Sequence, residues 1–244
     1  MHNLKIMILS IFALISLSQN GTIAMMQPSD EDTKGTPKML RKEYYEPITP
    51  ENAALVLVDH QVGLYTGVRD IPIDELKHNI MGLVKAMKVF KIPFVVTTTT
   101  ENIWGPMIPE LKELLKEHPT IQRTTVNAWD DPRVANAIEK TGRKKLIITG
   151  ISTDVCLAYP AITAVGKGYD VYAVIDASGA FTKTQGELGV LRMVQAGVKP
   201  VGYSNVAVEM LKDNASPLAS EVYGGLNMPF SGLVYGLNDY FSKK

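Results

Sequence analysis

The chain has 244 residues, with 25 basic and 25 acidic side chains, and a single cysteine. This length is enough for one α/β domain with a full core, and the balanced charge gives no electrostatic footprint for nucleic acid. One cysteine excludes an intramolecular disulfide. The four histidines are scattered and lack the close spacing of a zinc site, so we expect no metal and no other cofactor.

The first 24 residues have the pattern of a signal peptide. Lys5 precedes an apolar run over residues 6–17, and residues 22–24 (Thr-Ile-Ala) form a fair cleavage site. Residues 25–45 are polar, with proline and glycine, which predicts a flexible leader. We therefore expect a periplasmic or secreted protein that leaves the membrane after cleavage, and an uncleaved anchor is the alternative.

Beyond the leader, short apolar runs alternate with segments of helical spacing. The runs that predict strands are residues 53–59, 93–100, 120–125, 146–149, 169–175 and 198–203. Helices are expected over residues 74–90, 108–115, 131–138, 158–165, 184–196 and 206–212, and a loop over 101–107. This alternation predicts an α/β domain over residues 46–214, with helices on both faces of a mostly parallel six-stranded sheet.

The last segment, residues 215–244, is too apolar to extend freely into solvent and too short to fold alone. We expect it to pack on a neighbouring subunit in a homo-oligomer, and packing on its own domain is the alternative.

Three residues that carry chemistry fall near the carboxyl ends of predicted strands. Asp59 ends the first strand, Arg123 lies in the third, and Cys156 follows the fourth at the start of a helix. Ligands of open α/β sheets bind at this edge. Each residue also has a plain structural explanation: a cap for Asp59, an ordinary ion pair for Arg123, and a small buried apolar side chain for Cys156.

Together these residues have the chemistry of a nucleophilic site. A thiolate is the nucleophile, and a helix N-terminus and a guanidinium are expected to lower its pKa. Asp59 is suited to take the thiol proton and return it to a leaving group. Backbone N–H groups of the tight turn over residues 151–156 are placed to hold an oxyanion.

The sequence resembles the isochorismatase-like cysteine hydrolases, and most closely their YcaC-like branch. The motifs are LVDHQ at residues 57–61, NAWD at 127–130, ITGISTDVC at 148–156 and DASG at 176–179. The resemblance implies a doubly wound three-layer α/β/α fold and an octamer. It also implies an Asp–Lys–Cys triad in which Asp59 is the acid/base and Cys156 the nucleophile. Arg123 stands where the family has lysine, and arginine cannot shuttle a proton.

The resemblance further implies a cis peptide bond between Ile151 and Ser152 and an oxyanion hole made by the N–H groups of Ser152 and Cys156. It predicts a hydrolase of small amide or carbamoyl compounds that works through a thioester. A thiol redox or binding protein on the same fold is the alternative, and a vestigial site is a third reading. Side chains that either contact the substrate or simply pack are Gln61, Tyr65, Trp104, Trp129 and Tyr159.

Overall fold

The computed structural model describes residues 46–243, so the predicted signal peptide and leader lie outside the described residues. Within this range a parallel sheet of six strands has the order β3-β2-β1-β4-β5-β6. The strands are Ala53–Val58 (β1), Phe94–Thr99 (β2), Thr120–Arg123 (β3), Lys145–Gly150 (β4), Asp170–Val174 (β5) and Lys199–Val201 (β6). All six were predicted from the sequence, most of them a residue or two too long.

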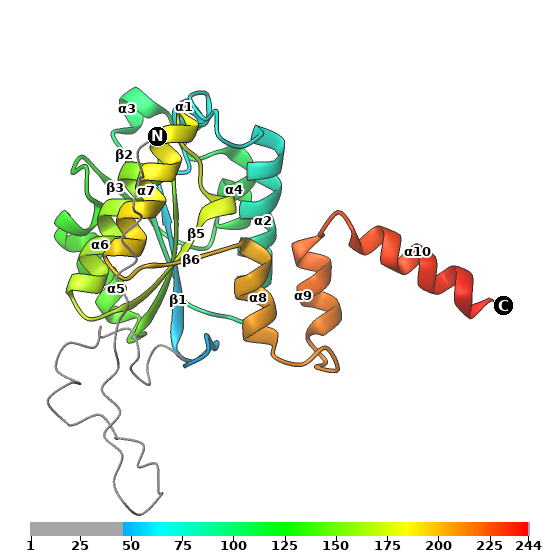
Figure 1. The fold of residues 1–244 in the computed structure, drawn as a ribbon. Helices are drawn as coiled ribbons and strands as arrows, with labels where there is room; N and C mark the ends of the chain where they lie inside the picture. The colour runs from blue at the N-terminus through cyan, green and yellow to red at the C-terminus, as the bar shows by residue number, and fades with distance from the viewer. Residues whose placement is uncertain (1–45, 244) are drawn as a thin grey trace, which may run out of the picture. The chain divides into compact units, whose positions relative to one another are not determined.

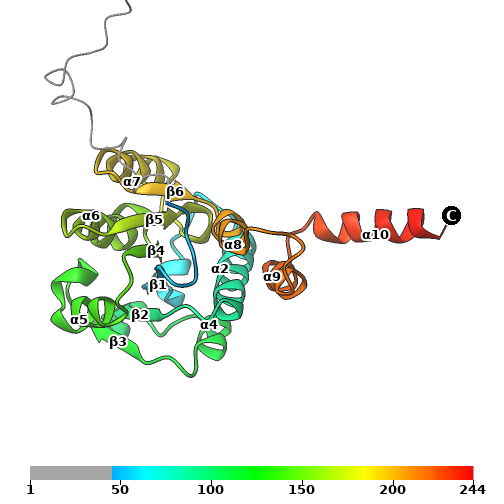
Figure 2. The ribbon, with the colours of Figure 1, turned by 90° about the horizontal axis from the view of Figure 1, so that it is seen from below.

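Helices cover both faces of this sheet (Figures 1 and 2). Ile73–Val89 (α2), Pro109–Leu114 (α4) and Tyr203–Leu211 (α8) lie on one face, and Ala219–Leu226 (α9) packs against α2. The other face carries Pro132–Lys140 (α5), Ala158–Gly166 (α6) and Lys183–Gln195 (α7). The predicted doubly wound α/β/α architecture is therefore confirmed.

The central strand β1 shows how the sequence produces these layers. All six of its residues are buried. Leu55 and Leu57 point into the core beneath α2, while Val56 and Val58 point into the core beneath α6. Because strand side chains alternate between faces, a continuous apolar run fits a strand that is covered on both sides.

Two short helices were not among those predicted from the sequence. Val62–Tyr65 (α1) follows Asp59, and Glu101–Trp104 (α3) follows β2. The expected loop over residues 101–107 is therefore wrong at its start. Thr100 precedes α3 at a φ of 38°, and Gly105 ends it at a φ of 73°. Gly105 adopts this left-handed backbone without the penalty that a side chain would bring.

The C-terminal segment forms α9 and a last helix, Ser231–Ser242 (α10). Val222 and Leu226 of α9 are buried in the core beneath α2, so this part packs on its own domain. On α10, in contrast, Leu233 is 72% exposed and Phe241 66% exposed. The segment expected to act as one unit therefore divides into a packed helix and an apolar, uncovered one. In residues 46–243 no helix combines the length and apolar character that crossing a membrane requires.

Candidate active site

Asp59 is fully buried at the carboxyl end of β1. Its backbone has a φ of 60°, and its N–H donates to the carbonyl of Thr97 at 3.0 Å. One carboxylate oxygen accepts from the Arg123 guanidinium at 2.5 Å, and the other lies 3.4 Å from the Thr97 hydroxyl. Because β1 is central in the sheet, this carboxylate lies in the middle of the edge where ligands of such folds bind.

Arg123 ends β3, and its side chain is also fully buried. β2 separates β3 from β1, so the guanidinium reaches across the end of β2 to Asp59. It also donates to the backbone carbonyls of Thr125 and Val126. A buried charge needs such partners, since its transfer from water is costly. The buried guanidinium of Arg123 is therefore held by an ion pair with Asp59.

Cys156 is half-buried in a π-helical turn, Thr153–Leu157, that leads directly into α6. The expected cis peptide bond between Ile151 and Ser152 is present at the start of this turn. Gly150 allows the turn to fold back on β4, because a Cβ there would lie 3.2 Å from the Cys156 carbonyl carbon. The thiol lies close enough to the Asp59 carboxylate and to the Ser152 backbone for both to shift its pKa. The structure thus brings the three predicted residues together.

The protonation of the thiol differs from our expectation. Burial raises the pKa of Cys156, and the neighbouring Asp59 carboxylate raises it further, whereas Arg123 and the Ser152 backbone lower it. We expected a guanidinium and a helix terminus to lower this pKa below its ordinary value. That prediction is wrong, because the net shift is upward. Burial also raises the pKa of Asp59, against the opposing effect of Arg123. At neutral pH the raised pKa keeps the Cys156 thiol protonated.

The five predicted contact residues separate into framework and accessible groups. Gln61 is buried, and its amide bonds to both the N–H and the carbonyl of Thr99 and to the carbonyl of Gly105. Tyr65 and Trp129 are buried in the two cores. Trp104 is 40% exposed, and Tyr159 is half-buried with the Arg192 guanidinium 5.1 Å from its ring. Of the five, Trp104 and Tyr159 are therefore the two whose side chains reach solvent.

His60, which sequence reasoning passed over, connects the site loops. It is buried, with Nδ1 2.9 Å from the Tyr65 hydroxyl and Nε2 2.8 Å from the Thr149 hydroxyl. These contacts join the segment after β1 to β4, one residue before Gly150. Its adjacency to Asp59 in the sequence was the available signal. Among residues 46–243, no three His, Cys, Asp or Glu side chains gather as metal ligands would.

Burial lowers the pKa of His60 from 6.5 to about 3, so this residue should make the fold sensitive to acid. Between those values the unfolded chain binds the proton and the folded chain does not. The contribution of neutral His60 to the free energy of unfolding is complete above pH 6.5. It is lost as the pH falls below that value, by roughly 1 kcal/mol per pH unit. We expect His60→Gln to flatten the dependence of unfolding free energy on pH, measured by urea titration. His118→Gln, at a less buried histidine, is the control and should keep most of the slope.

Comparison with protein families places most of the described chain in one of them. The model of the isochorismatase domain matches residues 53–203. The probable hydrolase YcaC of Escherichia coli K12 is 40% identical over 171 residues, which are 69% of this chain and 82% of that protein. The matched range includes all three residues of the site and every strand of the sheet.

Solved structures give the same relationship. YcaC of Pseudomonas aeruginosa superposes with a TM-score of 0.76 and 35% identity over 80% of this chain and 98% of that chain. E. coli YcaC is described as an octameric hydrolase of unknown specificity. It superposes with a TM-score of 0.76 and 36% identity, again over 80% of this chain and 98% of that chain. The nicotinamidase PncA of Bacillus subtilis, at 15% identity and a TM-score of 0.53, shares the fold alone. The chain thus belongs to the YcaC-like isochorismatase family of hydrolases.

Proposed function

We propose that this protein is a cysteine hydrolase that cleaves a small amide or carbamoyl compound through a thioester. The observation that carries the proposal is the position of Asp59, which lies near enough to the Cys156 thiol to shift its pKa and accepts a hydrogen bond from the Arg123 guanidinium. A carboxylate beside a thiol can act as its base, which is the pairing that nucleophilic catalysis requires.

In the first half of the proposed reaction, Asp59 takes the thiol proton as the Cys156 sulfur attacks the substrate carbonyl. The oxyanion accepts hydrogen bonds from the N–H groups of Ser152 and Cys156. When the tetrahedral intermediate collapses, the C–N bond breaks and Asp59 protonates the departing amine. The carbonyl carbon then remains on sulfur as a thioester.

In the second half, Asp59 takes a proton from water, which attacks the thioester carbonyl. The second tetrahedral intermediate releases the acid, and the sulfur recovers its proton from Asp59. Arg123 keeps its positive charge throughout, since its pKa lies far above neutrality. Its proposed role is to fix the carboxylate and to stabilise the negative charge that Asp59 and Cys156 share.

The resting state of the thiol favours this function over the redox alternative. Oxidation to sulfenic acid proceeds through the thiolate. A thiol whose pKa is raised by burial and by Asp59 reacts slowly with peroxide, yet it is ready for attack once the base removes its proton. The P. aeruginosa YcaC structure contains a covalent acrylamide. Acrylamide adds to thiols, and it is therefore a suitable probe for Cys156 here.

The test is a screen of small amides and carbamoyl compounds with the full chain, beside Cys156→Ala and Cys156→Ser. A substrate of the proposed class should release its amine with wild-type protein and give no turnover with either variant. Mass spectrometry of a quenched reaction should show a thioester adduct on Cys156. Turnover that survives Cys156→Ala, or an adduct on another residue, would contradict the proposal.

We also propose that the protein is a homo-oligomer and that α10 forms part of its interface. α10 presents Leu233, Leu237 and Phe241 to solvent at 58–72% exposure, and exposed apolar side chains gathered in this way mark an interaction site. The E. coli relative is an octamer. A second copy of this chain is therefore the proposed partner of this helix.

Leu233→Glu with Leu237→Glu is expected to reduce the oligomer to a smaller species, because the charges would have to be desolvated at the interface. Light scattering coupled to size-exclusion chromatography measures the mass. Ile103→Glu is the matched control, since Ile103 is 66% exposed on α3, outside the proposed interface. An unchanged mass in the double variant would place the interface elsewhere.

A further inference from the structure

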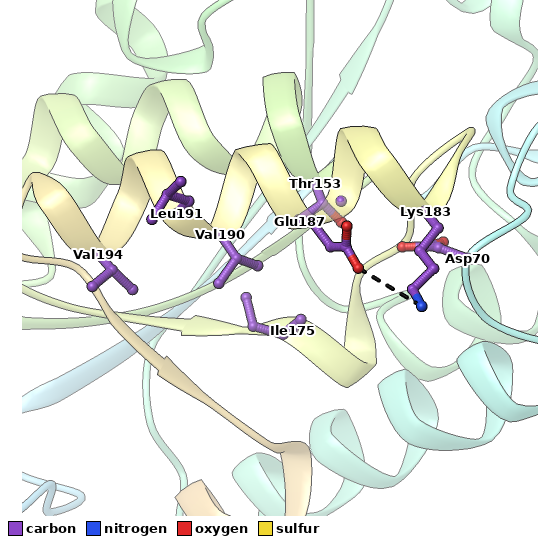
Figure 3. A pocket seen from close by; sticks show the side chains of 9 residues that line it. Asp70, Thr153, Ile175, Lys183, Glu187, Val190, Leu191 and Val194 are labelled. Carbon is purple, nitrogen blue, oxygen red and sulfur yellow. Dashed lines mark ion pairs between the residues drawn. The ribbon is translucent and has the colours of Figure 1, made fainter. Parts of the chain in front are cut away.

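A pocket of about 500 Å³ lies beside α7, away from the site described above (Figure 3). None of Asp59, Arg123 and Cys156 lines it. Its walls are largely apolar and come from α7 and from the end of β5, through Ile175, Val190, Leu191 and Val194. This volume and lining fall within the range of small-molecule sites, which combine apolar walls with a few polar groups.

Thr153 is the buried hydroxyl at this pocket. The residue is only 1% exposed, and its hydroxyl is buried without a hydrogen-bond partner among the described residues. Buried hydroxyls in folded proteins are nearly always bonded. An unpartnered hydroxyl that lines a pocket therefore points to a ligand that completes its hydrogen bonding.

The charges around the pocket are mostly negative. A second hollow of about 420 Å³ shares Asp70 and Ile175 with the first and adds Glu75 and Asp176. The Asp70 carboxylate is fixed by the Ala180 N–H at 2.7 Å. Lys183 is the cation that lines the first pocket, and its ammonium lies 3.8 Å from Glu187. We call the two hollows together the joint hollow. Its lining carboxylates thus outnumber its lining cation.

We propose that this joint hollow binds a small organic cation with an apolar body, such as a primary alkylammonium. The ammonium group of the ligand would lie against Asp70, and the hydrocarbon part of the ligand would lie along α7. The Thr153 hydroxyl would form with the ligand the hydrogen bond that it otherwise lacks. An anion would meet the four carboxylates Asp70, Glu75, Asp176 and Glu187, and a purely apolar molecule would leave the Thr153 hydroxyl without a partner. The site is additional to the proposed hydrolytic function and does not depend on it.

The same segment connects this pocket with the nucleophile. Thr153 begins the π-helical turn that carries Cys156. α7 packs on that turn through Gly189, where a Cβ would lie 2.7 Å from the Asp154 Cα. A ligand between α7 and Thr153 would therefore touch the far side of the turn. We expect its binding to change the rate at which acrylamide modifies Cys156.

The test is isothermal titration of the full chain with hexylammonium, with hexanoate and 1-hexanol as probes of equal chain length. We expect hexylammonium to bind and the other two to bind at least about tenfold more weakly, which corresponds to about 1.4 kcal/mol. Asp70→Asn should weaken binding by a similar factor. Thr153→Val should also weaken it, while raising the melting temperature of the ligand-free protein because an unpartnered hydroxyl is removed.

Control variants separate this site from the proposed catalytic one. Cys156→Ala should bind hexylammonium as the wild type does, and so should Glu221→Gln, which removes an exposed charge on α9. Leu191→Gln changes a half-exposed wall residue and should weaken binding without unfolding the protein. Equal binding of all three probes, no binding of hexylammonium at millimolar concentration, or loss of binding in Cys156→Ala would each overturn the proposal.

Discussion

Asp59→Asn should make Cys156 react faster with acrylamide near neutral pH, even as it abolishes turnover. The Asp59 charge raises the pKa of the thiol, and Arg123 lowers it. Asparagine removes the first effect and leaves the second, so the thiolate forms at lower pH. A neighbouring charge shifts a pKa by about 1–3 units, and the lower nucleophilicity of a more acidic thiol offsets about half of that gain. The expected acceleration is therefore roughly 3- to 40-fold.

The measurement is the rate of Cys156 alkylation as a function of pH, followed by mass spectrometry. The inflection of the profile should move to lower pH in Asp59→Asn and to higher pH in Arg123→Met, because the two charges act in opposite directions. Turnover of any substrate found in the screen should fall by about 10²–10⁴ in Asp59→Asn, as expected for loss of a general base. Slower alkylation in Asp59→Asn would show that the carboxylate activates the resting thiol directly.

Arg123→Met should lower the free energy of unfolding by roughly 3–5 kcal/mol. This is the largest stability effect that we expect from a single substitution. The substitution keeps an unbranched side chain but leaves the buried Asp59 carboxylate without its ion-pair partner. Urea unfolding measures the loss. The double variant Asp59→Asn with Arg123→Met should recover much of it, since it buries no unpaired charge.

Arg133→Met is the matched control for that experiment. Arg133 pairs with Asp131 at 2.7 Å, but its side chain is 64% exposed. An exposed ion pair contributes about 1 kcal/mol or less. Equal losses at Arg123 and Arg133, or a double variant no more stable than Arg123→Met alone, would contradict the view that the Asp59–Arg123 pair is energetically coupled.

The sequence was most informative where burial on both faces left a continuous apolar run. β1 and β4 were placed from such runs, and parallel strands necessarily bring their carboxyl ends to one edge. Asp59, Arg123 and Cys156 could therefore be grouped before any contact was known. The order of the strands could not be predicted in this way, since each βα unit can add to either side of the sheet. Only the structure shows that Arg123 must cross the end of β2.

What could not be predicted depends on contacts between distant residues. The pKa of Cys156 depends on which charge touches the thiol, and spacing along the chain does not say whether Asp59 or Arg123 lies nearer. Gln61 has the polarity of a substrate contact, yet its amide is fully occupied by the backbone of β2 and the loop after α3. α3 is a single turn, whose formation depends on packing more than on propensity.

The strand order also determines when the ribosome can complete the site. β1 pairs with β2 on one side and with β4 on the other. The half of the sheet that is synthesised first therefore contains both Asp59 and Arg123. Cys156 lies 97 positions after Asp59. At about 5–20 residues per second, the carboxylate precedes the thiol by roughly 5–20 s, and the guanidinium, which lies 33 positions before Cys156, precedes it by roughly 2–7 s. The carboxylate and the guanidinium are thus both synthesised before the thiol that lies beside them in the folded site.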